Sequence, residues 1–114
     1  MALIVSHPKI QFATATDGVR IAWASIGDGP TLVHLPGVPF SNLEGEWRVP
    51  VLQRAYERLA DRIRLVQYDG RGTGRSDREV TDLSIEGHLR DLDAVVESDV
   101  RDFVHVLLAL LARA

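Results

Sequence analysis

The sequence predicts an α/β fold in which an antiparallel β-hairpin leads into a parallel strand–helix–strand unit and one or more C-terminal helices. Three observations support this fold class. Two β-rich runs flank a Thr-Asp-Gly turn at residues 16–18, two short apolar runs at 31–35 and 63–68 enclose a segment with helical spacing, and helical spacing returns after residue 84. Short apolar strands that alternate with amphipathic helical segments are typical of βαβ units.

The composition indicates one small globular domain covering residues 1–114. Of the residues, 46% are hydrophobic and 25% are charged, as in ordinary globular proteins. The formal net charge of −3 argues against nucleic acid or an anionic membrane as a partner. The chain has no cysteine, which excludes disulfides and suits a cytoplasmic protein. The start of the chain lacks the features of a signal peptide, and the apolar run 103–112 is shorter than the roughly 20 residues that span a bilayer.

The first two predicted strands are residues 10–15 and 19–26, joined by the turn at 16–18. In the second of them Val19, Ile21, Trp23 and Ser25 alternate with their neighbours and therefore face one side. A Gly-Asp-Gly-Pro turn follows at 27–30, and the almost wholly apolar run 31–35 is expected to be a parallel strand that is covered on both faces.

A helix is predicted over residues 49–62, after Pro36 and Pro39 interrupt the strand and with Ser41 or Asn42 as a candidate cap. Its apolar residues lie at helical spacing and form one stripe: Val51, Leu52, Ala55, Tyr56, Leu59 and Ala60. The run 63–68 is the next strand. Strand, helix and strand together form a crossover that is expected to be right-handed.

A second helix is predicted to begin near Thr81, Asp82 or Ser84. Its expected buried stripe is Ile85, Leu89, Leu92, Val95 and Val96, whereas the acidic run Asp91, Asp93, Glu97 and Asp99 is interpreted as a solvated face. Residues 98–112 are compatible with a buried strand or with a helix. Their length and the absence of helix breakers favour a helix.

The strand 63–68 ends in a glycine-rich loop whose key positions are Asp69, Arg71, Gly72, Gly74 and Ser76. This pattern resembles the Asp-x-Arg-Gly-x-Gly-x-Ser loop of the α/β-hydrolase superfamily, in its esterase, epoxide-hydrolase and haloperoxidase-like branch. The resemblance covers residues 10–96 and implies a partial α/β-hydrolase fold. It also implies a structural loop, in which Asp69 accepts backbone N–H groups, Arg71 holds neighbouring segments and Ser76 orients the end of the loop.

A second motif, Leu-Pro-Gly-Val-Pro at 35–39, resembles the oxyanion loop of the same family. The resemblance implies that Val38 offers its backbone N–H to a developing negative charge and that Gly37 allows the backbone to approach. The family pattern has a histidine where this chain has Pro36. The nearest histidine, His34, lies two residues earlier.

The sequence offers no convincing nucleophile or cofactor site. Ser76 lies in Gly-x-Ser-x-Arg, and Arg78 occupies the position where a nucleophile elbow requires glycine. A dinucleotide fingerprint fails because its third glycine is Arg75. The four histidines, His7, His34, His88 and His105, lack metal-ligand spacing. We therefore expect no cofactor.

The resemblance implies that the nucleophile comes later than the present residues, so the chain is expected to be truncated before the elbow and inactive alone, as a fragment or a pseudoenzyme. A non-enzymatic module that binds a small acyl or aromatic ligand near Val38, Trp47 and Gly70 is the alternative. A third hypothesis is a site completed between molecules. If residues 98–112 are helical, the strand 31–35 becomes an exposed edge, and self-association into a homo-oligomer is expected.

Overall fold

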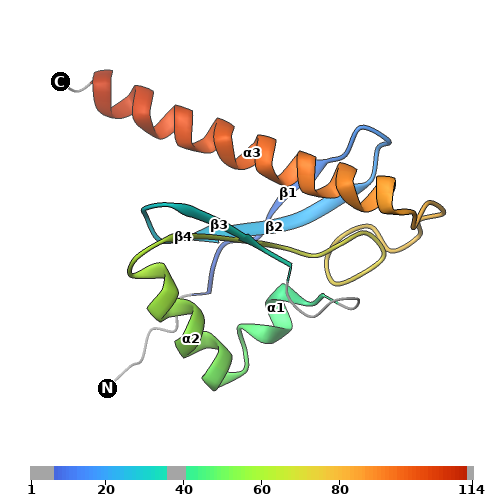
Figure 1. Cartoon of the computed structure of the whole chain (residues 1–114), viewed down its shortest axis with the longest axis horizontal. Helices are drawn as coiled ribbons and strands as arrows, with labels where there is room; N and C mark the ends of the chain where they lie inside the picture. The colour runs from blue at the N-terminus through green and yellow to red at the C-terminus, as the bar shows by residue number, and fades with distance from the viewer. Residues whose placement is uncertain (1–6, 36–40, 113–114) are drawn as a thin grey trace.

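The computed structural model describes residues 7–35 and 41–112, with the side chains described as far as residue 101. Its four strands form one sheet in the order β1-β2-β4-β3, and helices lie on both sides of it (Figure 1). The elements in chain order are β1 Gln11–Thr14, β2 Arg20–Ile26, β3 Thr31–His34, α1 Leu43–Glu46, α2 Pro50–Ala60, β4 Arg64–Tyr68 and α3 Ile85–Ala112.

The strand pairing confirms the predicted fold class. Strand β1 runs antiparallel to β2, with Ala13 opposite Ile21. Strand β3 runs parallel to β4, with Leu32 opposite Leu65, as a strand–helix–strand unit requires. Strand β4 also pairs antiparallel with β2, so it lies between the hairpin and β3 and joins the two predicted units into one sheet.

Two hydrophobic cores lie on opposite faces of the sheet, because successive side chains of a strand point to opposite sides. Ile21 and Trp23 of β2 pack with Val95 of α3. Ala24 of β2 instead packs with Trp47 in the core that α1 and α2 cover. Helix α3 covers one face, and α1 and α2 cover the other (Figure 1).

The helix boundaries follow from caps that the sequence encodes. The Asn42 side chain accepts from the Gly45 backbone N–H at 2.9 Å and caps the short helix α1, which was not predicted, instead of the predicted helix 49–62. Pro50 opens α2, where its missing N–H costs nothing. Ser84 accepts from the Gly87 N–H at 3.1 Å and precedes α3. Helix α3 then continues to Ala112, so residues 98–112 are helical.

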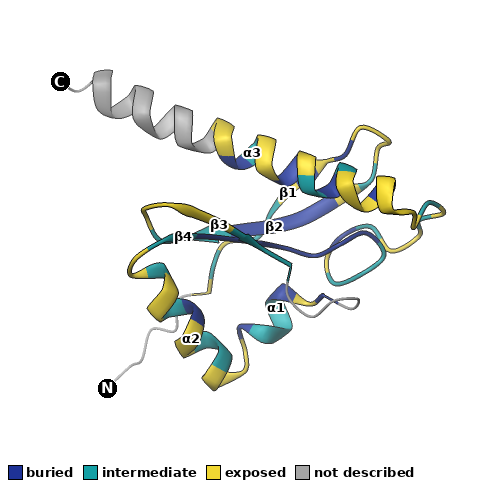
Figure 2. Ribbon diagram, viewed as in Figure 1, coloured by how far each residue is buried: buried dark blue, intermediate teal, exposed yellow. Residues whose placement is uncertain are grey.

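The predicted buried stripe of α3 is wrong in part. Val95 is buried, but Ile85 is 75% exposed, and Leu89 and Val96 are exposed as well (Figure 2). The face toward the sheet instead carries Gly87, Asp91, Ala94, Val95 and Asp99. Asp91 and Asp99 were expected at the surface, yet both are buried. An arginine reaches each carboxylate, and a paired charge can be buried where an isolated one cannot.

Strand β3 is an edge of the sheet, as the helical reading of residues 98–112 predicted. Leu32, in its middle, is 49% exposed. Asp99 of α3 bonds to Arg64 of β4 at 2.8 Å, whereas Ala94 and Glu97 lie beside Thr14 on the β1 side. By helical spacing, the exposed apolar residues Leu89 and Val96 lie on the same side of α3 as Asp99. They are therefore on the side of the helix that is nearer to β4 and β3. In the part of the chain that the structure describes, no helix has the length and apolar character needed to cross a membrane.

Candidate functional site

The glycine-rich loop after β4 is organised around the carboxylate of Asp69, which is fully buried. One oxygen accepts from the Leu43 backbone N–H at 2.8 Å, and the other accepts from the Arg75 backbone N–H at 2.9 Å. Hydrogen bonds of this charge-assisted kind are about twice as strong as neutral ones. Asp69 therefore ties the end of β4 both to the start of α1 and to its own loop.

The guanidinium of Arg71 links three further segments at a buried position. It bonds bidentately to Asp17 of the β1–β2 turn at 2.8 and 3.1 Å. It also donates to Asp91 of α3 at 3.0 Å and to the Asp82 carbonyl at 3.0 Å. The hydrogen bonds that Arg71 donates to Asp17 and Asp91 raise the pKa of Arg71 above its ordinary value. The same contact with Arg71 lowers the pKa of Asp17.

Arg90 of α3 extends this network to the surface. It bonds to Asp82 at 3.0 Å and lies 3.6 Å from Asp17. Hydrogen bonds from Ser84 and then Arg90 lower the pKa of Asp82 to about 2. An open hollow of about 650 Å³ lies over these charges, and Thr16, Val19 and Val80 also line it. Its charged lining differs from the mostly apolar lining of small-molecule sites.

The serine hydroxyls near the loop make structural hydrogen bonds. The Ser76 Oγ donates to the Asp69 carbonyl at 2.6 Å and accepts from the Ala22 N–H at 2.8 Å. The Ser41 Oγ accepts from the Gly70 N–H at 2.8 Å and lies 2.8 Å from the Thr73 Oγ1. Within the described ranges, no serine hydroxyl is hydrogen bonded to a histidine.

The loop closes on itself at Gly72 and Gly74, whose φ angles are +79° and +51°. L-amino acids with side chains rarely adopt such angles. At Gly74 the constraint is also steric, because a Cβ atom would stand 2.0 Å from the Asp69 Oδ2. Gly37 and Val38, the candidate oxyanion residues, lie outside the described residues.

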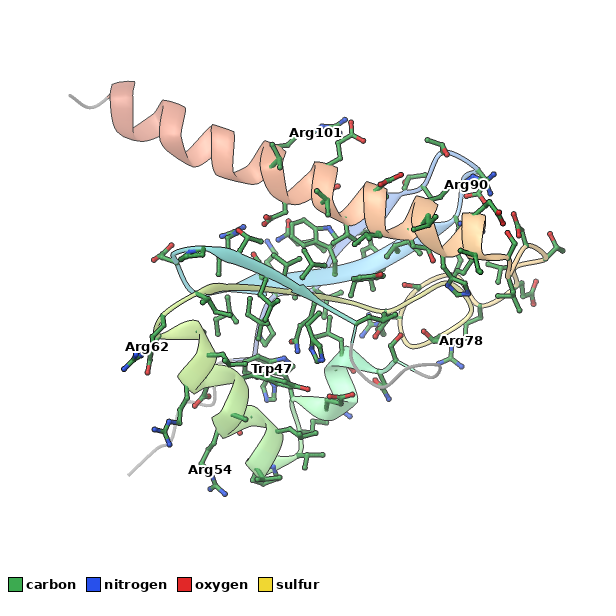
Figure 3. The ribbon with its side chains drawn as sticks, in the orientation of Figure 1. Trp47, Arg54, Arg62, Arg78, Arg90 and Arg101 are labelled. Atoms are coloured by element: carbon green, nitrogen blue, oxygen red, sulfur yellow. The ribbon has the colours of Figure 1, made fainter. Side chains whose placement is uncertain are left out.

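A second polar network, which the sequence did not reveal, lies between the sheet and helices α1 and α2. Trp47 donates to Gln67 of β4 at 2.8 Å, and Gln67 lies 3.1 Å from His34 of β3. The Tyr56 hydroxyl donates to the Glu46 carboxylate, and the Tyr56 ring packs against both His34 and Trp47. Figure 3 shows Trp47 between the sheet and α2. Trp47 also lines a cavity of about 250 Å³ with Pro8, Ile10 and Leu43, but Gly70 does not.

The buried hydroxyl of Tyr56 gives the chain an alkaline stability limit. Desolvation, then the hydrogen bond to Glu46, raise its pKa from 10.0 to about 12. Since the folded chain holds this proton more tightly than the unfolded chain, the stabilisation is complete below pH 10.0 and is lost as the pH rises through about 12.

We expect the unfolding free energy of the wild-type chain to fall by about 2 kcal/mol more than that of Tyr56→Phe between about pH 10 and pH 12. Urea unfolding of both chains across this range measures the difference. Equal losses in the two chains would contradict it, because all other titrating groups are shared.

Comparison with known proteins places these features in context. No family model matches the sequence. The chain is 40% identical over 96 residues to the "Probable oxidoreductase EphD" of Mycobacterium tuberculosis strain H37Rv and to the protein of the same name from Mycobacterium bovis. The match covers 80% of this chain and 15% of each relative. The chain therefore spans less than a sixth of the length of these curated relatives.

Solved structures show the same fold in longer chains. An esterase from Exiguobacterium antarcticum superposes with a TM-score of 0.63 and 28% identity, over 77% of this chain and 31% of the esterase. An alpha/beta hydrolase from Sphaerobacter thermophilus gives 0.62 and 31% identity, over 77% and 31%. The epoxide hydrolase CorEH gives 0.63 and 26% identity, over 79% and 29%. The chain thus spans about a third of each solved protein.

Proposed function

Because the chain belongs to the α/β-hydrolase superfamily, we propose that it forms the N-terminal framework of an ester- or epoxide-hydrolysing site and does not hydrolyse substrates alone. Nucleophilic hydrolysis needs a nucleophile, a base and oxyanion donors together. The framework supplies the sheet, the loop after β3 and the glycine-rich loop after β4 that contains Asp69 and Arg71.

The observation that carries this proposal is the use of the polar groups in the Asp69 loop. Both oxygens of Asp69 accept backbone N–H groups, and the hydroxyl of Ser76 both donates and accepts within the fold. A catalytic serine needs a free hydroxyl beside a base. These residues therefore hold the loop in place. The direct test is hydrolysis of p-nitrophenyl acetate by the purified chain, for which we expect no rate above the background.

We further propose that the isolated chain self-associates through β3. Its outer edge is not paired among the described residues, and Leu32 is 49% exposed on this strand. Open apolar edges of this kind favour pairing with another chain.

Light scattering coupled to size-exclusion chromatography should show association that increases with concentration. Leu32→Lys should weaken it about tenfold, since burying a leucine contributes on the order of 1.5 kcal/mol. Val51→Lys, at an exposed position of α2, is the matched control and should leave it unchanged. A monomer at all concentrations would count against the proposal.

A non-enzymatic binding module is the second candidate, favoured by the 250 Å³ cavity beside Trp47. Pro8, Ile10 and Leu43 give it an apolar wall for a short acyl chain or an aromatic ring, and His7, Glu44 and Arg48 also line it. Titration with octanoate, followed by tryptophan fluorescence, tests it. Saturable quenching without ester hydrolysis would favour binding, and unchanged fluorescence would exclude octanoate as a ligand.

A further inference from the structure

A buried chain of hydrogen bonds runs from α1 to the open edge of the sheet. The Trp47 Nε1 lies 2.8 Å from the Gln67 Oε1, and the Gln67 Nε2 lies 3.1 Å from the His34 Nδ1. Trp47 is 1% exposed and Gln67 is 2% exposed. Water therefore does not compete for the Trp47–Gln67 bond, and the Gln67–His34 bond is part-buried. Each partner must satisfy the other.

Trp47 determines which atom donates and which accepts in both of these hydrogen bonds. An indole nitrogen can donate a hydrogen bond but cannot accept one. The atom of Gln67 that faces Trp47 must therefore be its oxygen, and the atom that faces His34 must be its NH₂ group. Since that group only donates, the Nδ1 of His34 must accept, and it can do so only without a proton.

We infer that the chain of bonds from Trp47 holds His34 as the neutral imidazole with its proton on Nε2, so that His34 is a hydrogen-bond donor at the carboxyl end of β3. The half-buried side chain of His34 makes no other hydrogen bond among the described residues. Its Nε2–H is thus available to an oxygen acceptor, such as a carbonyl or a carboxylate. A proton abstracted by Nε2, or a metal bound there, would require this chain of bonds to break.

The Nε2–H donor of His34 lies at the edge of the sheet where ligands of open α/β sheets bind. His34 is the last residue of β3 and lies opposite Gln67 in the parallel register. Ligands of open α/β sheets bind outside the carboxyl ends of the parallel strands. The use of the donor for an acyl oxygen rests on the proposed function, whereas the protonation state of His34 does not. Because its test does not measure hydrolysis, failure of one proposal is distinguishable from failure of the other.

The tautomer can be measured by long-range ¹H–¹⁵N correlation of the imidazole rings in the ¹⁵N-labelled chain at about pH 8, where ordinary histidines are neutral. His34→Gln assigns the resonances among the four histidines of the chain. We expect an unprotonated Nδ1 and a protonated Nε2 for His34.

Gln67→Glu is the decisive variant, because a carboxylate only accepts hydrogen bonds. Its oxygens can keep both neighbours only if the Nδ1 of His34 gains a proton, so the Nδ1 signal should change to the protonated type. Gln53→Glu, on α2, makes the same chemical change elsewhere and should leave His34 as in the wild type. A protonated Nδ1 in the neutral wild-type ring, or an unchanged Nδ1 in folded Gln67→Glu, would overturn the inference. The wild-type spectrum decides even if Gln67→Glu does not fold.

Discussion

Replacing Arg71 with methionine should destabilise the folded chain by about 3–5 kcal/mol, the usual cost of removing one partner of a buried ion pair. Methionine fills much of the same space but leaves the Asp91 carboxylate, which is 0% exposed, without its cation. Bonds from Arg71 to the β1–β2 turn and to the Asp82 carbonyl are lost as well. Urea unfolding followed by circular dichroism measures the change.

Arg75→Met is the matched control, because Arg75 lies in the same loop and its ion pair with Glu44 is exposed. Exposed pairs contribute between about 0 and 1 kcal/mol, so this variant should remain close to the wild type. The double variant Arg71→Met with Asp91→Leu should recover part of the loss, since it removes the uncompensated charge. Similar effects at Arg71 and Arg75 would show that the buried network does not hold the loop.

Gly74→Ala should destabilise the folded chain by about 3–5 kcal/mol. An L-residue at a positive φ costs about 1–2 kcal/mol. In addition, the new Cβ would stand 2.0 Å from the Asp69 Oδ2 and would push that oxygen away from the Arg75 N–H. A lost hydrogen bond to a charged group costs about 1.5–3 kcal/mol.

Gly18→Ala separates the two contributions. Gly18 also has a positive φ, of +92°, but a Cβ there meets no atom within 4 Å. We expect this variant to lose only about 1–2 kcal/mol. Equal losses at Gly18 and Gly74, measured by urea unfolding, would mean that the Asp69 carboxylate is not fixed by the loop.

The sequence predicted the strands and the βαβ unit well because alternation and turn residues act locally. The Thr-Asp-Gly turn and the Ser84 cap each depend on a few neighbouring residues, whereas Asn42 caps α1 and not the predicted helix 49–62. The buried face of helix α3 was harder to predict, because it is set by contacts with residues far away in the sequence. Apolar periodicity pointed to Ile85 and Leu89, whereas the pairing of Asp91 with Arg71 turned a charged residue inward.

The candidate site was likewise predictable only where its features depend on neighbouring residues. The glycine spacing identified the loop of Asp69 and Arg71, but it could not supply the partners of Arg71, which come from the β1–β2 turn and α3. The network of Trp47, Gln67 and His34 was missed, although one pattern pointed to it. Gln67 and His34 are the polar residues near the ends of two apolar strands, and a parallel register brings such positions together.

Hydrolysis of p-nitrophenyl acetate, measured across the size-exclusion peak of the purified chain, tests most directly whether the chain is a framework without its own catalysis. We predict that the wild type, Ser76→Ala and His105→Ala give the same rate as buffer, and that any residual activity follows contaminating fractions. Turnover that follows the protein peak and is abolished by Ser76→Ala in a folded chain would contradict the account. It would mean that the Ser76 hydroxyl attacks substrate in place of its bonds to Asp69 and Ala22.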